Sequence, residues 1–215
     1  MEIEIRQLTF WYQEKEVLSN LNLTVEKGES IGILGTSGSG KSTLLKLIAG
    51  LYEPTSGSIE VRGEREPERI RRKIAMVMQS AMLLPATIRE NITCGHEMEE
   101  SWIEHVCEAA QLTSWIRSLP SGIDTYLGER GNSLSGGQAQ RIAIARAMAK
   151  KAEVILLDEA TSALDPNTSE AVMEALNYLT IGKTVVHVTH HPELLLHCNR
   201  IFSLEGGKLY EKGAN

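Results

Sequence analysis

The stretch Ile31-Gly32-Ile33-Leu34-Gly35-Thr36-Ser37-Gly38-Ser39-Gly40-Lys41-Ser42-Thr43-Leu44-Leu45 decides the fold of this chain. It begins with an apolar run typical of a strand, continues through a turn of glycine and serine, and ends on apolar residues typical of a helix start. Gly35, four further residues and then Gly40-Lys41-Ser42 is the spacing of a phosphate-binding loop, or P-loop. The pattern therefore predicts a site for a nucleoside triphosphate.

The residue types in this loop suit phosphate chemistry. Glycines let the backbone approach phosphate oxygens without a Cβ in the way. Backbone N–H groups and the start of the following helix direct partial positive charge at the anion. We expect Lys41 to reach the β- and γ-phosphates and the Ser42 hydroxyl to hold Mg²⁺. The predicted nucleotide contacts in the loop are Gly35, Thr36, Ser37, Gly38, Ser39, Gly40, Lys41, Ser42 and Thr43.

The composition is that of a globular protein of one large domain. The chain has 215 residues, of which 42% are hydrophobic, and its formal net charge of −6 argues against a nucleic-acid surface. The cysteines Cys94, Cys107 and Cys198 are scattered, so neither a disulfide framework nor a zinc site is expected. No run of 18 apolar residues occurs and the first residues do not form a signal peptide, so we expect the isolated chain to be soluble.

Apolar periodicity divides the chain into α/β and helical parts. Alternating residues in the first 25 positions predict antiparallel strands with one wet face. Continuous apolar runs near residues 31, 154 and 184 predict a parallel sheet that is buried on both faces. Residues 80–148 carry helical periodicity and almost no strand signal. We therefore expect a single domain, 1–215, in which residues 1–79 and 149–215 form the α/β core and 80–148 a helical insertion.

A pair of carboxylates follows the buried strand predicted at Val154–Leu157. In an open α/β sheet the carboxyl ends of the strands carry the chemistry, and Asp158 and Glu159 stand at such an end. We expect Asp158 to hold Mg²⁺ and Glu159 to act as general base on the attacking water. The alternative, a solvated acidic turn, is disfavoured by the phosphate-binding loop.

The segment Leu134-Ser135-Gly136-Gly137-Gln138 resembles the signature motif of the ATP-binding cassette (ABC) family. As chemistry alone, Ser-Gly-Gly before a helix is a second anion site. The resemblance extends over essentially the whole chain. It implies a P-loop NTPase core of the RecA-like type with an antiparallel β subdomain and a helical signature subdomain. It also implies a head-to-tail dimer with a second nucleotide-binding domain, in which Ser135, Gly136, Gly137 and Gln138 cap the ATP of the opposite subunit.

The other motifs of the family occur in order, and the resemblance implies their roles. Tyr12 looks like the aromatic that stacks on adenine. Gln79 matches the glutamine that contacts Mg²⁺ and couples to the transmembrane partner. Ser162-Ala163-Leu164-Asp165 matches the loop that crosses the dimer seam, and His190 matches the histidine that contacts the γ-phosphate. His187, His191 and His197 are assigned no such role.

Two segments look like those that exporter-type cassettes present to transmembrane coupling helices, namely Thr87–Ile92 and Leu127–Gly131. The resemblance thus implies an ATPase that uses ATP and Mg²⁺, pairs with transmembrane domains at the cytoplasmic face of the cell membrane, and drives export. Exporters usually join cassette and membrane domain in one chain, so this chain is either an excised domain or a separate subunit. The alternatives are a soluble ABC ATPase without a transport role and a regulatory cassette that only binds nucleotide.

Overall fold

The computed structural model describes residues 1–128, 134–160 and 166–212, and the chain divides into two compact units. The first unit comprises Met1–Met76, Ala152–Glu159 and Gly182–Asn215. The second comprises Val77–Lys151 and Ala160–Ile181. The expected helical segment 80–148 lies within the second unit, which also includes residues 77–79, 149–151 and 160–181.

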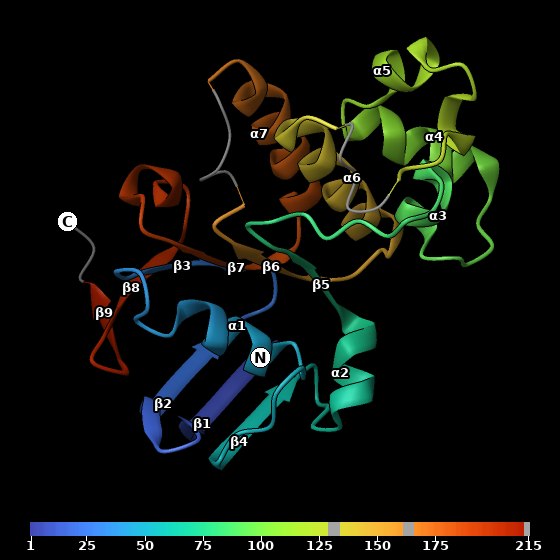
Figure 1. Ribbon diagram of the computed structural model, residues 1–215. Coiled ribbons are helices and arrows are strands. Elements are labelled where there is room, and N and C mark those ends of the chain that lie inside the picture. Colours follow the sequence, from blue (N-terminus) through green and yellow to red (C-terminus); the bar gives the residue numbers. More distant parts are fainter. Residues whose placement is uncertain (129–133, 161–165, 213–215) are drawn as a thin grey trace. The chain divides into compact units, whose positions relative to one another are not determined.

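A six-stranded sheet in the order β5-β6-β7-β3-β8-β9 organises the first unit (Figure 1). β3 runs parallel to both β7 and β8, β6 runs parallel to β7, and β8 pairs antiparallel with β9. The strands are β3 (Ser30–Leu34), β5 (Ile74–Val77), β6 (Val154–Asp158), β7 (Thr184–Thr189), β8 (Arg200–Glu205) and β9 (Lys208–Lys212).

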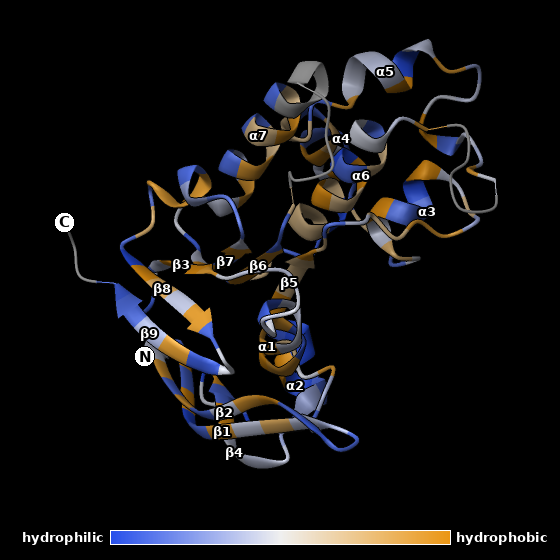
Figure 2. Cartoon of the chain, turned by 60° about the vertical axis from the view of Figure 1, so that its left-hand side comes forward, coloured by the Kyte–Doolittle hydropathy of each residue, from blue (hydrophilic) through white to orange (hydrophobic). Residues whose placement is uncertain are grey.

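The predicted burial of the central strands is confirmed. All five residues of β6 are buried, and so are five of the six residues of β7. In β3, Ile31 and Ile33 are fully buried and pair with Val186 and Val188. Figure 2 shows the apolar colouring of this sheet. A strand without a polar face must be covered on both sides, which is why its sequence shows no alternation.

The antiparallel β subdomain is also confirmed. Three strands, β1 (Ile3–Tyr12), β2 (Lys15–Val25) and β4 (Ser56–Val61), pair antiparallel in the order β2-β1-β4. In β1 the buried residues Ile3, Ile5, Leu8 and Phe10 alternate with more exposed ones, apart from the two consecutive exposed residues Arg6 and Gln7. This sheet therefore turns one face to the core and the other to water.

Helix α1 (Lys41–Ile48) follows the phosphate-binding loop and buries Leu44, Leu45, Leu47 and Ile48. It ends at Gly50, whose backbone is left-handed with φ 67° and lies so close to Pro67 that a Cβ would approach the Pro67 carbonyl oxygen to 3.0 Å. Only glycine suits both conditions, so the helix stops here. The remaining helices of the first unit are α2 (Pro67–Lys73) and the 3₁₀ helix η3 (Pro192–Leu195).

The second unit is helical, as the sequence predicts. Helix α6 packs against α3, α4 and α7 and buries mainly small residues. The elements are α3 (Ile88–Thr93), α4 (Glu100–Ala109), α5 (Thr113–Ser118), η1 (Gly122–Asp124), α6 (Gly136–Ala149) and α7 (Pro166–Thr180). Within the ranges that the structure describes, no helix is both long enough and apolar enough to cross a membrane.

Candidate functional site

The phosphate-binding loop joins β3 to α1 and depends on glycine at two positions. A Cβ on Gly35 would lie 2.5 Å from the Ser39 hydroxyl, and Gly40, the N-cap of α1, has φ 104°. No side chain caps α1 at Gly40, so the first backbone N–H groups of the helix face the loop without a capping acceptor. The same loop contains Thr36, Ser37 and Gly38, and the first turn of α1 contains Thr43.

Lys41 turns back over this loop and is only 5% exposed. Its Nζ donates hydrogen bonds to the carbonyl oxygens of Gly35 (2.7 Å) and Thr36 (2.9 Å). The same Nζ lies 3.5 Å from Oε1 of Glu159. A buried ammonium group held by carbonyls and one carboxylate is poised to exchange these partners for phosphate oxygens.

Ser42 and Asp158 meet beside the loop. The Ser42 Oγ donates a hydrogen bond of 2.9 Å to Oδ1 of Asp158, the last residue of β6. Burial raises the pKa of Asp158, and the neighbouring Glu159 carboxylate raises it further, whereas the bond from Ser42 lowers it. A hydroxyl and a carboxylate oxygen are ligand types that suit a hard cation.

The raised pKa of Asp158 yields a prediction about stability. The folded chain binds the Asp158 proton more readily than the unfolded chain, so the ionised carboxylate destabilises the fold above its raised pKa. We expect Asp158→Asn to raise the Tm of the nucleotide-free chain at pH 7 by about 2–4 °C, or roughly 1 kcal/mol. The gain should shrink as the pH falls through the raised pKa and vanish below the ordinary value of 3.8. Calorimetry over a range of pH, with EDTA present, measures the rise in Tm and its dependence on pH. A rise in Tm that does not depend on pH would contradict the prediction.

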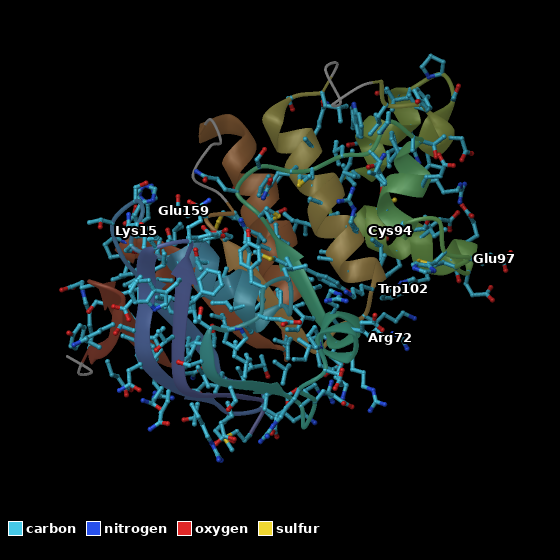
Figure 3. All side chains as sticks on the ribbon, turned by 60° about the horizontal axis from the view of Figure 1, so that its bottom comes forward. Lys15, Arg72, Cys94, Glu97, Trp102 and Glu159 are labelled. Atoms are coloured by element: carbon cyan, nitrogen blue, oxygen red, sulfur yellow. The ribbon has the colours of Figure 1, made fainter. Side chains whose placement is uncertain are left out.

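Glu159, which is labelled in Figure 3, comes directly after β6. Its carboxylate links Lys41, at the start of α1, to His190, which follows β7. Its backbone is left-handed with φ 46°, and its N–H donates to the carbonyl of Val188 on β7 at 3.0 Å. Such a conformation in a residue other than glycine is uncommon and frequently marks a functional site. The side chain is mostly buried, with Oε1 near Lys41 and Oε2 at 3.0 Å from Nδ1 of His190.

The charge of Glu159 follows from these partners. Partial burial alone would raise the pKa of its carboxyl group, but the hydrogen bond and charge of His190, together with Lys41, lower it below the ordinary 4.5. Glu159 is therefore ionised at neutral pH. His190 itself is 46% exposed, so one side of the imidazole remains open to solvent.

The other histidines near the strand ends are placed differently. His187 lies on β7, and burial lowers its pKa to about 4, so it is neutral and part of the sheet. His191 Nδ1 lies 3.1 Å from Glu193 Oε1, and the centre of its ring lies 4.0 Å from that of His190.

Tyr12 lies at the end of β1 within a cluster of three aromatic rings. Its ring meets Phe10 edge-on at 5.0 Å and Tyr52 edge-on at 5.7 Å, and it is 42% exposed. A side-chain hydrogen bond with Tyr52 and partial burial raise the pKa of Tyr12. Sequence reasoning named Tyr12 but missed Tyr52, because a lone tyrosine after a helix carries no motif.

The residues of the loop fit a nucleoside triphosphate with Mg²⁺. Among the described side chains, the buried Ser39 hydroxyl in the loop has no hydrogen-bond partner. No group of three or more His, Cys, Asp or Glu side chains in the described ranges is placed to hold a metal ion by itself. Mg²⁺ commonly takes one or two protein oxygens and completes its shell with waters and substrate phosphates, which matches Ser42 and Asp158.

The signature residues begin α6 in the second unit. Ser135 Oγ accepts a hydrogen bond from the backbone N–H of Gln138 (3.2 Å), and Gln138 Oε1 accepts one from the N–H of Ser135 (2.9 Å). This reciprocal arrangement is a capping box. Gly136 is exposed, and a Cβ at that position would meet nothing within 4 Å. Gly137 is buried, so the start of the helix presents backbone rather than side chains.

Gln140 is a buried residue of this helix that the sequence analysis did not single out. Its Nε2 donates to the carbonyl oxygens of Met78 (3.0 Å) and Ala160 (2.9 Å). Met78 precedes Gln79, the predicted coupling glutamine, which also belongs to the second unit. α6 also carries Gln138, Arg141 and Arg146, so no sequence pattern singles out Gln140.

The segment Thr87–Ile92 is organised by Asn91, which is fully buried. Its side chain exchanges hydrogen bonds with the backbone of Leu84 and also donates to the carbonyl of Thr87. Arg146 of α6 donates to the carbonyls of Asn91 and Met82. The Ser162–Asp165 segment, and Glu129–Gly131 of the second exporter-like segment, lie outside the described residues.

Known proteins resemble this chain along nearly its whole length. The sequence profile of a family described as "ABC transporter" matches residues 18–162, which is more than half of the chain. The "ATP-dependent lipid A-core flippase" of Burkholderia pseudomallei (strain 1710b) is 40% identical over 99% of this chain and 37% of its own length. The "ABC transporter B family member 15" of Arabidopsis thaliana is 40% identical over the full chain and 18% of its own length.

A solved structure shows the same fold. It is described as a bacterial Atm1-family ABC exporter with ATP bound, and it aligns with a TM-score of 0.90 and 32% identity over 99% of this chain. The alignment covers 38% of that exporter. The chain thus spans little more than a third of the length of the bacterial relatives it matches.

Proposed function

Because the chain belongs to the ABC transporter family, as one of its ATP-binding domains, we propose that it hydrolyses ATP in sites completed by two such domains and thereby powers export. The observation that carries the proposal is the connected set of contacts around the phosphate-binding loop. Lys41, Glu159 and His190 form one chain of polar contacts, and Ser42 and Asp158 form a second pair beside it.

We propose that the loop and helix α1 bind the triphosphate. Backbone N–H groups from Gly35 to Thr43 would surround the β- and γ-phosphates, and Lys41 would exchange its two carbonyl partners for phosphate oxygens. Tyr12 would stack on adenine. Ser42, Asp158 and Gln79 would hold Mg²⁺, which when bound neutralises charge on the phosphates.

Hydrolysis then requires a water in line with the γ-phosphate. Glu159 is ionised and lies at the strand end, so it would orient and polarise this water as general base. His190, paired with Glu159 and open to solvent on its other side, would contact the γ-phosphate. Phosphoryl transfer relies mostly on positioning and charge stabilisation, which is what these two side chains supply.

Each site would be completed by a second copy or a related domain. Ser135, Gly136, Gly137 and Gln138 of one subunit would cap the ATP held by the other in a head-to-tail dimer. The exposed glycine at the start of α6 and the 14-residue helix behind it suit a phosphate. The γ-phosphate is the contact that differs between the closed and open states, so its release would reopen the dimer.

The exporter role is supported by the relatives, which are named as a flippase and as ABC exporters. We propose that transmembrane domains are the partners, that the chain works at the cytoplasmic face of the cell membrane through them, and that Thr87–Ile92 belongs to the coupling surface. One domain, residues 1–215, would carry all of the cassette motifs.

The dimer can be tested through the ATPase rate per chain. We expect this rate to rise with protein concentration in the presence of Mg²⁺, because the monomer holds only part of each site. A rate that is independent of concentration would show that the site is complete in one chain. The measurement is steady-state phosphate release over a wide range of protein concentrations.

A mixing experiment separates the two halves of the site. Gly136→Ala places a methyl group where the chain itself has open space, so it should disturb only what docks there. Glu159→Gln leaves the signature intact. Mixed in equal amounts, these two weakly active variants should recover up to about a quarter of the wild-type rate, since half of the dimers then contain one complete site of two. No recovery would contradict the head-to-tail arrangement.

A further inference from the structure

Tyr52 is an aromatic residue beside the predicted adenine platform to which no motif assigns a role. We propose that Tyr52 is a positioning residue that fixes the ring of Tyr12 relative to the phosphate-binding loop, and that it thereby sets the affinity for the adenine base. The inference rests on the proposed function, because it takes Tyr12 as the residue that stacks on the base.

Tyr12 needs such support because of its place in the chain. It is the last residue of β1 and pairs with Lys15 across a two-residue turn, in which Gln13 is left-handed with φ 51°. The tip of a hairpin is among the more mobile parts of a sheet. The ring of Tyr12 is 42% exposed, so the core does not hold it on all sides.

Tyr52 supplies an aromatic contact from a different element, beside the side-chain hydrogen bond that Tyr12 has with Thr43 of α1. It follows α1, and its ring stacks on Phe10 at 5.7 Å with an interplanar angle of 10°. It meets Tyr12 edge-on at 5.7 Å and 86°, which is a favourable geometry for aromatic pairs. The Nζ of Lys46, on α1, lies 5.7 Å from the centre of the Tyr52 ring.

This arrangement ties the two ends of the nucleotide site together. Helix α1 begins with Lys41 and Ser42 and ends just before Tyr52. The Tyr52 ring therefore connects the base platform on β1 to the same helix that carries the phosphate ligands. A base that stacks on a ring already held in place loses less freedom on binding, so the affinity gain comes from preorganisation.

The far side of Tyr52 makes it a suitable residue to replace. Together with Leu47, Gly50, Ile59 and Ile70 it lines an open pocket of about 270 Å³ in the first unit. A smaller side chain at this position would therefore extend an existing pocket instead of creating a sealed cavity in the core.

The test compares ATP with inorganic tripolyphosphate, which lacks the base, by calorimetric titration of the whole chain with EDTA present. We expect Tyr52→Leu to raise the Kd for ATP about 2- to 10-fold, which corresponds to the usual contribution of one aromatic pair. Its Kd for tripolyphosphate should stay within about 2-fold of wild type. Tyr52→Phe, which retains the ring, should restore ATP affinity to within about 2-fold. Tyr210→Leu, an exposed tyrosine on β9, is the matched control.

A double-mutant cycle shows whether Tyr52 acts through Tyr12. If it does, Tyr52→Leu adds little to the loss already caused by Tyr12→Leu. Additive losses, or equal losses for ATP and tripolyphosphate, would overturn the inference. If the wild-type chain binds ATP and Tyr52→Leu binds it with the same Kd, the inference about Tyr52 is overturned and the proposed function stands. Absence of ATP binding by the wild-type chain would instead overturn the proposed function, and this inference with it.

Discussion

Glu159→Gln is expected to lower the ATPase rate by about 100- to 10,000-fold, which is the usual contribution of a general base. Glutamine matches the shape of glutamate, and its Oε1 can still accept a hydrogen bond from Lys41 or His190, but it does not polarise the attacking water as a carboxylate does. ATP binding should therefore persist, and the dimer should accumulate in its closed, ATP-bound form. Phosphate release measures the first effect, and light scattering with ATP present measures the second.

Glu153→Gln is the matched control for this experiment. Glu153 precedes the same strand, β6, but pairs with Lys183 at the surface and is 41% exposed. An exposed ion pair contributes little, so the control should keep the wild-type rate and stability within error. If Glu159→Gln hydrolysed ATP at the wild-type rate, Glu159 would not be the general base.

Lys41→Ala is expected to weaken ATP binding by roughly 30- to 4,000-fold, since removing one partner of a buried charge contact costs about 2–5 kcal/mol. Lys41 is 5% exposed, and its Nζ lies 3.5 Å from Oε1 of Glu159. Without it, the phosphates would face the Glu159 carboxylate with one positive charge fewer. Calorimetric titration with ATP in EDTA gives the Kd directly.

Two companion variants define what Lys41 contributes. Lys27→Ala removes an exposed lysine from the turn before β3 and should leave the Kd unchanged. Lys41→Arg keeps the charge, but a planar guanidinium cannot reproduce the compact contacts to Gly35 and Thr36, so it should bind weakly as well. Wild-type affinity in Lys41→Ala would show that the loop backbone alone holds the phosphates.

The elements that the sequence predicts well are those with strong apolar patterns. The strands β3, β6 and β7 are buried on both faces and appear in the sequence as continuous apolar runs. Strand β1 is buried on one face and appears as alternating apolar and polar residues. The weaker elements were not identifiable in this way. Helix α2 buries only Ile70, and the edge strand β9 has no fully buried residue, so neither shows an apolar periodicity. Helix α7 was also not assigned from the sequence.

Individual site residues were easier to identify than their contacts. The spacing of the loop marks Lys41 and Ser42, and the strand end marks Asp158 and Glu159, since these patterns are local. That Glu159 touches both Lys41 and His190 depends on β3, β6 and β7 lying side by side, which only the fold determines. Tyr52 and Gln140 act through neighbours that are distant in sequence, so no local pattern reveals them.

The order of strands in the central sheet has a consequence for how the chain is synthesised. β3 leaves the ribosome early, yet it pairs only with β7 and β8, so that Ser30 finds Val185 after the second unit has been made. At ordinary rates of translation the delay is roughly 8 to 30 s. During this time Ile31 and Ile33, which end fully buried, have no partner strand. The nascent chain thus leaves these two apolar residues without their partner strands during this time, and β3 is a segment that a ribosome-bound chaperone would be expected to cover.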